Sequence, residues 1–178
     1  MEAIEQTWNG PSTTAGRCTA TISRNGDLVY RMYFEVTNAA ATATNCDNPG
    51  HSFITDVELE IGGQKIDKQT GLWMETWAQL TEPNPSGAVR QANAATLGTL
   101  FQKMSGAGGV NAVTGGIAAG KLFVPLQFWF CRNPGLALPL IALQYHEVKV
   151  ILNHNIIAAC GAGAKNSLFC DYIYLDTD

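Results

Sequence analysis

One stretch of the sequence has glycines and a lysine at the spacing of a phosphate-binding loop. Residues 115–122 read Gly-Gly-Ile-Ala-Ala-Gly-Lys-Leu and satisfy the pattern G-x-x-x-x-G-K. A working loop of this kind continues with Ser or Thr, which binds magnesium, and it opens a helix whose N-terminus faces the phosphates. Here Leu122 follows the lysine, and Lys121 starts an apolar run typical of a strand. The pattern therefore indicates a loop rich in glycine and alanine, and no nucleotide site is predicted.

Three carboxylates, Asp56, Glu58 and Glu60, alternate with apolar residues and so share one face of a predicted strand. Successive members would lie about 7 Å apart, a separation that suits acid–base catalysis or a metal ion. The solvated outer face of a sheet produces the same alternation, and no histidine is interleaved with the carboxylates. We therefore interpret the row as a solvated outer face, with a metal or acid–base site as the weaker alternative.

The remaining candidate residues do not form a site. His146 and Glu147 are adjacent on a predicted strand, so their side chains leave opposite faces. His146 shares its face with apolar residues and is predicted to be buried and hydrogen-bonded, whereas His154 would lie roughly 26 Å farther along. The five cysteines lack CxxC spacing and are interpreted as reduced thiols. We therefore predict no catalytic residues, no cofactor, no metal ligands and no enzymatic activity.

Composition narrows the functional classes further. The chain has 178 residues, of which 46% are hydrophobic and 15% charged, and its formal net charge is −4. This length and apolar content predict a single domain with its own core. The acidic balance and the lack of a basic run argue against direct binding to nucleic acid. The most apolar windows, 122–130 and 136–143, are shorter than the roughly 20 residues of a membrane-spanning helix.

Period-two alternation dominates the sequence and predicts an all-β antiparallel sandwich of about eight strands. The predicted strands cover 2–8, 17–23, 28–36, 53–61, 64–68, 121–131, 144–153 and 167–175. Asn25-Gly26 predicts a tight hairpin between the second and third of these strands, and Gly62-Gly63 predicts a turn between the fourth and fifth. One core is expected where four apolar faces meet, those of 28–36, 53–61, 122–130 and 148–152.

Two segments have helical periodicity instead. The apolar face Trp73, Trp77 and Leu80 predicts a short helix over 72–81, and a second face predicts a helix over 95–104. The second face consists of Leu97, Leu100, Phe101 and Met104. We expect both helices to cover an end of the sandwich. The long loops, rich in Gly and Ala, are predicted at 37–52, 83–93, 105–120 and 158–166.

Four blocks of sequence, in this order, resemble one known family. They are Ile-Ser-Arg-Asn-Gly-Asp-Leu at 22–28, Asp-Val-Glu-Leu-Glu-Ile-Gly-Gly-Gln-Lys-Ile-Asp-Lys at 56–68, the Asn-Pro-Gly corner and following strand within 129–150, and Asp-Tyr-Ile-Tyr-Leu-Asp-Thr at 171–177. Together they resemble the double jelly-roll major capsid proteins of the large nucleocytoplasmic DNA viruses, found in phycodnaviruses, iridoviruses and mimivirus relatives. The blocks match the first jelly roll of that family.

The resemblance implies a structural protein of a viral capsid. In that family each subunit carries two eight-stranded jelly rolls, and three subunits form a capsomer that tiles an icosahedral shell. Residues 1–178 would be one jelly-roll domain, without the family's N-terminal arm and second roll. The implied partners are copies of the chain and other capsid proteins, with no nucleic acid or small-molecule substrate. The implied location is the virion capsid, after synthesis in the host cytoplasm; the alternative is a carbohydrate-binding or host-attachment module.

The predicted strand 121–131 is apolar on both faces. Phe123 and Trp129 lie opposite Leu122, Val124 and Phe128, so this strand needs cover on both sides. The resemblance implies that a partner roll, a neighbouring subunit or the helices around 73–77 supply that cover. Any part left bare would favour self-association.

Overall fold

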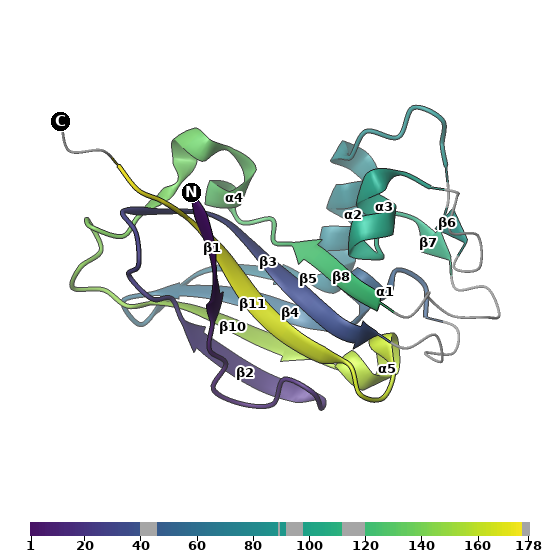
Figure 1. Ribbon diagram of the computed structural model, residues 1–178, viewed down its shortest axis with the longest axis horizontal. Helices are drawn as coiled ribbons and strands as arrows, with labels where there is room; N and C mark the ends of the chain where they lie inside the picture. Colours follow the sequence, from purple (N-terminus) through teal and green to yellow (C-terminus); the bar gives the residue numbers. More distant parts are fainter. Residues whose placement is uncertain (40–45, 89, 92–97, 112–119, 176–178) are drawn as a thin grey trace.

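The computed structural model describes residues 1–39, 46–88, 90–91, 98–111 and 120–175, which form a sandwich of two sheets (Figure 1). The first sheet has the order β1-β11-β3-β8, with β9 also paired to β3. Its strands are β1 (Glu2–Gln6), β3 (Leu28–Ala39), β8 (Gly120–Pro125), β9 (Leu138–Pro139) and β11 (Lys165–Ile173).

The second sheet has the order β2-β10-β4-β5. Its strands are β2 (Gly16–Thr21), β4 (Ile54–Ile61), β5 (Gln64–Thr70) and β10 (Val148–His154). Every pairing in the two sheets is antiparallel. The predicted all-β sandwich is confirmed, with five and four strands in its two sheets, where about eight strands were predicted in all. A separate small parallel pair joins β6 (Arg90–Gln91) to β7 (Val110–Asn111).

Alternating residues of the two sheets meet in one core. Met32, Phe34 and Val36 of β3 are buried, and Val57 and Leu59 of β4 are buried in the same cluster. The cluster also includes two residues of β8 and three of β10, namely Leu122, Val124, Val148, Val150 and Leu152. The predicted meeting of four apolar faces is therefore confirmed, and each large side chain buried there contributes about 1.5–3 kcal/mol.

The two predicted tight turns have different outcomes. Gly62 and Gly63 join β4 to β5 in a hairpin, with φ values of 59° and 80°, the left-handed conformation that such a turn requires. The hairpin predicted at Asn25-Gly26 is wrong, because β2 and β3 belong to different sheets and the segment crosses between them. A Cβ at Gly26 would lie 2.9 Å from the Cβ of Tyr172. This glycine therefore serves a close approach to β11.

The strand predicted over 121–131 is wrong beyond Pro125, where β8 ends. The chain leaves the sheet and forms the short helix α4 (Trp129–Arg132). Phe128 and Phe130 both remain buried, with stacked rings whose centroids lie 5.8 Å apart. The apolar alternation in this stretch therefore reflects two phenylalanines that enter the core from a loop and a helical turn.

The strand predicted over 144–153 begins only at Val148. The preceding residues form turns, with hydrogen bonds from Leu143 N to Leu140 O at 3.1 Å and from His146 N to Leu143 O at 2.9 Å. His146 is exposed in this turn region. The prediction of a buried His146 is therefore wrong, because the period of the strand does not extend back to it.

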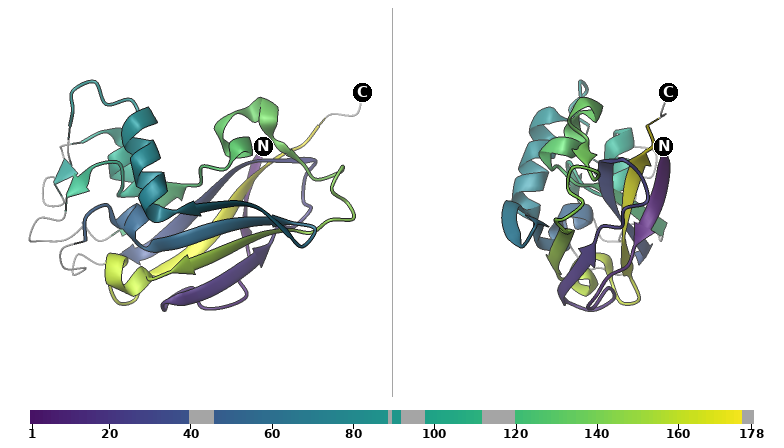
Figure 2. Two further views of the ribbon diagram at one scale, coloured as in Figure 1. Left: turned by 180° about the vertical axis from the view of Figure 1, so that it is seen from behind. Right: turned by 90° about the vertical axis from the view of Figure 1, so that its left-hand side faces the viewer.

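Both predicted helices are present and lie together at one end of the sandwich (Figures 1 and 2). They are α2 (Gly71–Thr81) and α3 (Leu100–Ser105); residues 95–97 of the second prediction lie outside the described residues. Short helices that were not predicted are α1 (Pro49–Ser52), α4, η1 (Pro134–Leu136) and α5 (Ile156–Cys160). No helix in the described part of the chain is long and apolar enough to cross a membrane.

The two helices cover one end of the sandwich as expected (Figure 1), but not with the predicted faces: α2 places Met74 in the core and also buries Ala78, while the predicted apolar faces of both helices are partly exposed. In α2, Leu80 is 79% exposed, while Glu75 lies on the buried side. In α3, Leu100 is 81% exposed, while Gln102 and Ser105 are buried. The exposed parts of the predicted faces leave apolar surface available for contact with another molecule.

Candidate functional site

The carboxylate row lies on the outer face of β4 but is not bare, so the prediction of a solvated face is wrong for its central member. Glu58 is only 7% exposed, and its Oε1 lies 2.9 Å from Lys65 Nζ and 3.1 Å from Lys68 Nζ. The hydrogen bond from Lys65 and then that from Lys68 lower the pKa of Glu58 despite its burial. Asp56 pairs with Lys68, and Glu60 with Lys149. Cross-strand lysines thus neutralise the row.

The other candidates from the sequence are also dispersed. Residues 115–119 of the glycine-rich pattern lie outside the described residues, while Lys121 lies at the start of β8 and forms an ion pair with Glu35. His154 is buried, with its Nε2 2.9 Å from the carbonyl oxygen of Pro11. In the described part of the chain, no three His, Cys, Asp or Glu side chains are grouped so that they could hold a metal ion.

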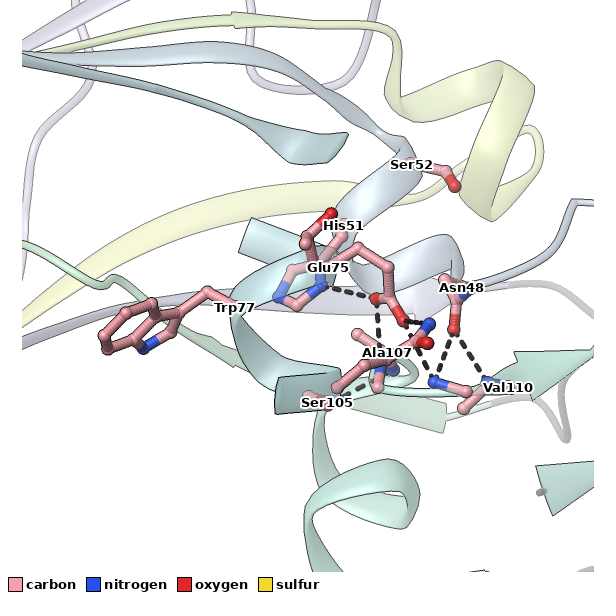
Figure 3. A network of polar contacts seen from close by, with 12 residues as sticks. Asn48, His51, Ser52, Glu75, Trp77, Ser105, Ala107 and Val110 are labelled. Carbon is pink, nitrogen blue, oxygen red and sulfur yellow. Dashed lines mark hydrogen bonds and ion pairs between the residues drawn. The ribbon is translucent and has the colours of Figure 1, made fainter. Parts of the chain in front are cut away.

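The structure does bring together a buried polar cluster that the sequence did not reveal (Figure 3). His51 on α1 points its Nδ1 at Glu75 on α2, with 2.7 Å between Nδ1 and Oε2. Gly108 N donates to the same oxygen at 2.9 Å. The other oxygen, Oε1, accepts from Gln79 Nε2 at 2.7 Å and from Gly109 N at 3.0 Å. One carboxylate therefore ties two helices to the loop that follows α3.

Electrostatics explain how Glu75 remains ionised in this position. Burial alone would raise its pKa, but hydrogen bonds from His51, Gln79 and the backbone of Gly108 together lower it. A His–Glu pair could in principle act as a general base. Here each carboxylate oxygen already accepts two hydrogen bonds, and Phe101 packs near the imidazole with ring centroids 6.5 Å apart. The cluster is therefore suited to holding segments in place.

A neighbouring side chain extends the same anchoring. Asn48 Oδ1 accepts from Gly109 N at 2.9 Å and from Val110 N at 2.7 Å. Asn48 N also donates to Val110 O at 2.8 Å. The sequence held one signal for this cluster, since Glu75 is the single charged residue of α2 and sits between apolar positions. Apart from Gln79 on the same helix, the partners of Glu75 come from distant segments, so the sequence alone could not identify them.

A hollow of about 520 Å³ lies over the first sheet, between α2, α3 and α4. We call it the groove. Tyr33 of β3 and Phe123 of β8 lie in its lining, with ring centroids 6.2 Å apart. Trp77 of α2 and Phe101 and Met104 of α3 also line it. The surplus apolar surface expected around 121–131 is thus partly enclosed by the helices and partly open.

Arginine 132 completes one side of the groove. The Arg132 guanidinium carbon lies 4.3 Å from the centroid of the Trp77 ring and 5.7 Å from that of Trp73, while its Nε donates to Gln127 O at 3.0 Å. The two indoles stack with centroids 5.6 Å apart. Cation–π contacts of this kind contribute about 0.5–1 kcal/mol each at exposed sites. Arg132 therefore stabilises the position of α4 relative to α2 across the groove.

Comparison with known proteins gives one consistent result. A family model described as "Major capsid protein N-terminus" matches residues 1–176. The major capsid protein of Phaeocystis pouchetii virus is 44% identical over 219 residues, which covers 100% of this chain and 42% of that protein. The major capsid protein of Pyramimonas orientalis virus is 44% identical over 187 residues, which covers 100% of this chain and 45% of that protein.

A solved structure agrees with these relatives. PBCV-1 VP54, as fitted into a cryo-EM reconstruction of the virophage Sputnik, superposes with a TM-score of 0.75 at 34% identity. The superposition covers 99% of this chain and 42% of that chain. The mavirus major capsid protein, at 13% identity and a TM-score of 0.53, supports the fold alone. The chain thus spans less than half the length of the curated relatives named here.

Proposed function

Because the chain belongs to the major capsid protein family, we propose that it forms the N-terminal jelly roll of a subunit of a viral capsid. Its work in this proposal is structural: it self-associates into capsomers that tile an icosahedral shell. The main support for this proposal is the match of residues 1–176 to the N-terminal part of such proteins. The resemblance read from the sequence is confirmed at the level of family and of jelly-roll fold.

The proposed partners are other copies of the chain, in a trimeric capsomer, and other capsid proteins. Direct contact with nucleic acid is not part of the proposal. The net charge of −4 argues against nucleic-acid binding, and so does the pairing of lysines on the outer sheet faces with carboxylates. Nucleic-acid binding relies on basic side chains free to meet phosphates.

The proposed location is the virion capsid, with synthesis in the host cytoplasm and no enzymatic activity. The cysteines support a reducing site of synthesis, since all five are free thiols. Burial raises the pKa of Cys18 and Cys160 to about 12, which keeps these two as unreactive thiols. The saturated hydrogen bonding of Glu75 supports the absence of catalysis at the polar cluster.

Electron microscopy of the purified chain over a concentration series tests the proposal. We expect assemblies of uniform size and symmetry that become more abundant with concentration. A glycan array run on the same preparation tests the alternative of a carbohydrate-binding or host-attachment module, and we expect it to be silent. A chain that stays monomeric and binds a defined glycan would refute the structural proposal and favour the alternative.

A further inference from the structure

The groove described above is mainly apolar, and its lining contains equal numbers of positive and negative side chains. Tyr33, Phe123 and Met104 contribute apolar atoms to its lining. Its charged lining residues are two arginines and two acids, Arg31, Arg132, Glu82 and Asp171. A segment with an unpaired charge would lose hydration on entering such a site and gain no net opposite charge. The groove therefore favours an uncharged apolar occupant.

The chain itself carries a segment of that chemistry. Residues 133–145 contain no Asp, Glu, Lys, Arg or His. Two large side chains project from its turns into solvent: Ile141 is 65% exposed and Tyr145 is 87% exposed. An aromatic side chain with a polar tip is a frequent anchor of protein interfaces.

The structure holds this segment in a defined shape. Arg24 Nη2 donates to Leu143 O at 2.8 Å and to His146 O at 3.4 Å. Leu140 N donates to Asp27 O at 3.0 Å, and Leu138 and Pro139 pair with β3. An exposed apolar segment that is already ordered loses little conformational entropy on binding. This favours a docking element over a passive loop.

The segment starts next to Arg132 of the groove lining, but its turns around Ile141 line a separate hollow together with Arg24 and Tyr174. The turns before β10 project at the end of the sandwich opposite α2 and α3 (Figure 1). We infer that the 133–145 segment of one copy docks into the groove of a second copy, with Tyr145 as its anchor. The contact is head-to-tail, so repeated use generates a ring if the rotation closes. This inference rests on the proposed self-association and names the surfaces that carry it.

Two exposed substitutions test the two halves of the contact. Met104→Glu places a charge in the groove, and Tyr145→Glu places one on the docking segment; Met104 is 38% exposed and Tyr145 is 87% exposed, so both variants should fold. We expect each variant alone to raise the dissociation constant for self-association at least tenfold, measured by sedimentation equilibrium. Ile66→Glu, at a 48% exposed position on β5, is the matched control and should leave the dissociation constant unchanged.

Mixing the two variants separates a head-to-tail contact from a symmetric one. The Met104→Glu chain keeps an intact segment, and the Tyr145→Glu chain keeps an intact groove. One contact can then form between them, so an equimolar mixture should give a 1:1 heterodimer that grows no further. If the wild type assembles and both variants assemble equally well, the docking surfaces are wrong while the structural function stands. If the wild type stays monomeric at high concentration, this inference and the proposed self-association of the chain both fail.

Discussion

Replacing Glu75 by Gln is a direct test of whether the buried polar cluster holds the helical end of the protein together. The substitution keeps the size of the side chain but replaces one oxygen by an NH2 group. The carboxylate accepts four hydrogen bonds, two at each oxygen. In the amide, the NH2 group must face either the His51 and Gly108 donors or the Gln79 and Gly109 donors. If it faces His51, the imidazole can change tautomer and accept, but Gly108 N is left without its acceptor.

The expected loss follows from these contacts. A buried N–H without a partner costs about 1–3 kcal/mol, and hydrogen bonds to a charged group contribute more than neutral ones. We therefore expect Glu75→Gln to lower the free energy of unfolding at pH 7 by about 2–4 kcal/mol. That is a large part of the stability of an ordinary domain.

The pH dependence provides a second readout. Because the folded state lowers the pKa of Glu75, the wild type gains stability from this group above its unfolded pKa of about 4.3. That contribution is lost as the pH falls through the lower folded pKa. The Gln variant has no such group, so its stability should fall less steeply than that of the wild type as the pH is lowered below about 5.

Urea unfolding followed by tryptophan fluorescence and circular dichroism would measure both effects. Glu5→Gln, the same chemical change at an exposed position of β1, is the control and should stay within about 0.5 kcal/mol of the wild type. The anchoring role of the cluster would be refuted by a Glu75→Gln variant that is as stable as that control and loses stability at low pH as steeply as the wild type.

Three further predictions concern the core, the packing of α1 and the glycine-rich pattern. Leu59→Ala should lower the free energy of unfolding by about 2–5 kcal/mol in urea titrations. Glu58→Ala should lower it by less, because the lysine partners of Glu58 remain half in solvent. Equal losses for the two variants would mean that the register of β4 is wrong. Gly50→Ala should prevent native folding, because the new Cβ would lie 1.8 Å from Ser105 O. The expected signs are loss of soluble protein or of near-UV circular dichroism, and a variant with the melting temperature of the wild type would contradict this close approach. Calorimetry with ATP and magnesium should show no heat of binding, and micromolar affinity abolished by Lys121→Ala would overturn this interpretation of the glycine-rich loop.

The sequence by itself determined the class of fold and the family. Alternation of apolar residues is a property of the extended backbone, in which neighbouring side chains leave opposite faces. It therefore predicted β3, β4 and the core residues Phe34 and Leu59 from local sequence alone. Gly62-Gly63 likewise predicted its turn, since the positive φ of both residues is a local requirement.

The tertiary structure decided where each local element faces. The Asn25-Gly26 segment looks like a hairpin, but pairing with β10 and β11 places β2 and β3 in different sheets. The face of α2 that contains Trp73 looks like a core face, yet Glu75 on the other side faces inward, where it contacts groups from two distant segments, His51 and the loop at Gly108 and Gly109. Met74 and Ala78 are buried on the same side as Glu75. Core packing and hydrogen bonds with groups far apart in the sequence therefore decided together which side of α2 faces inward, because a buried carboxylate without partners would be costly.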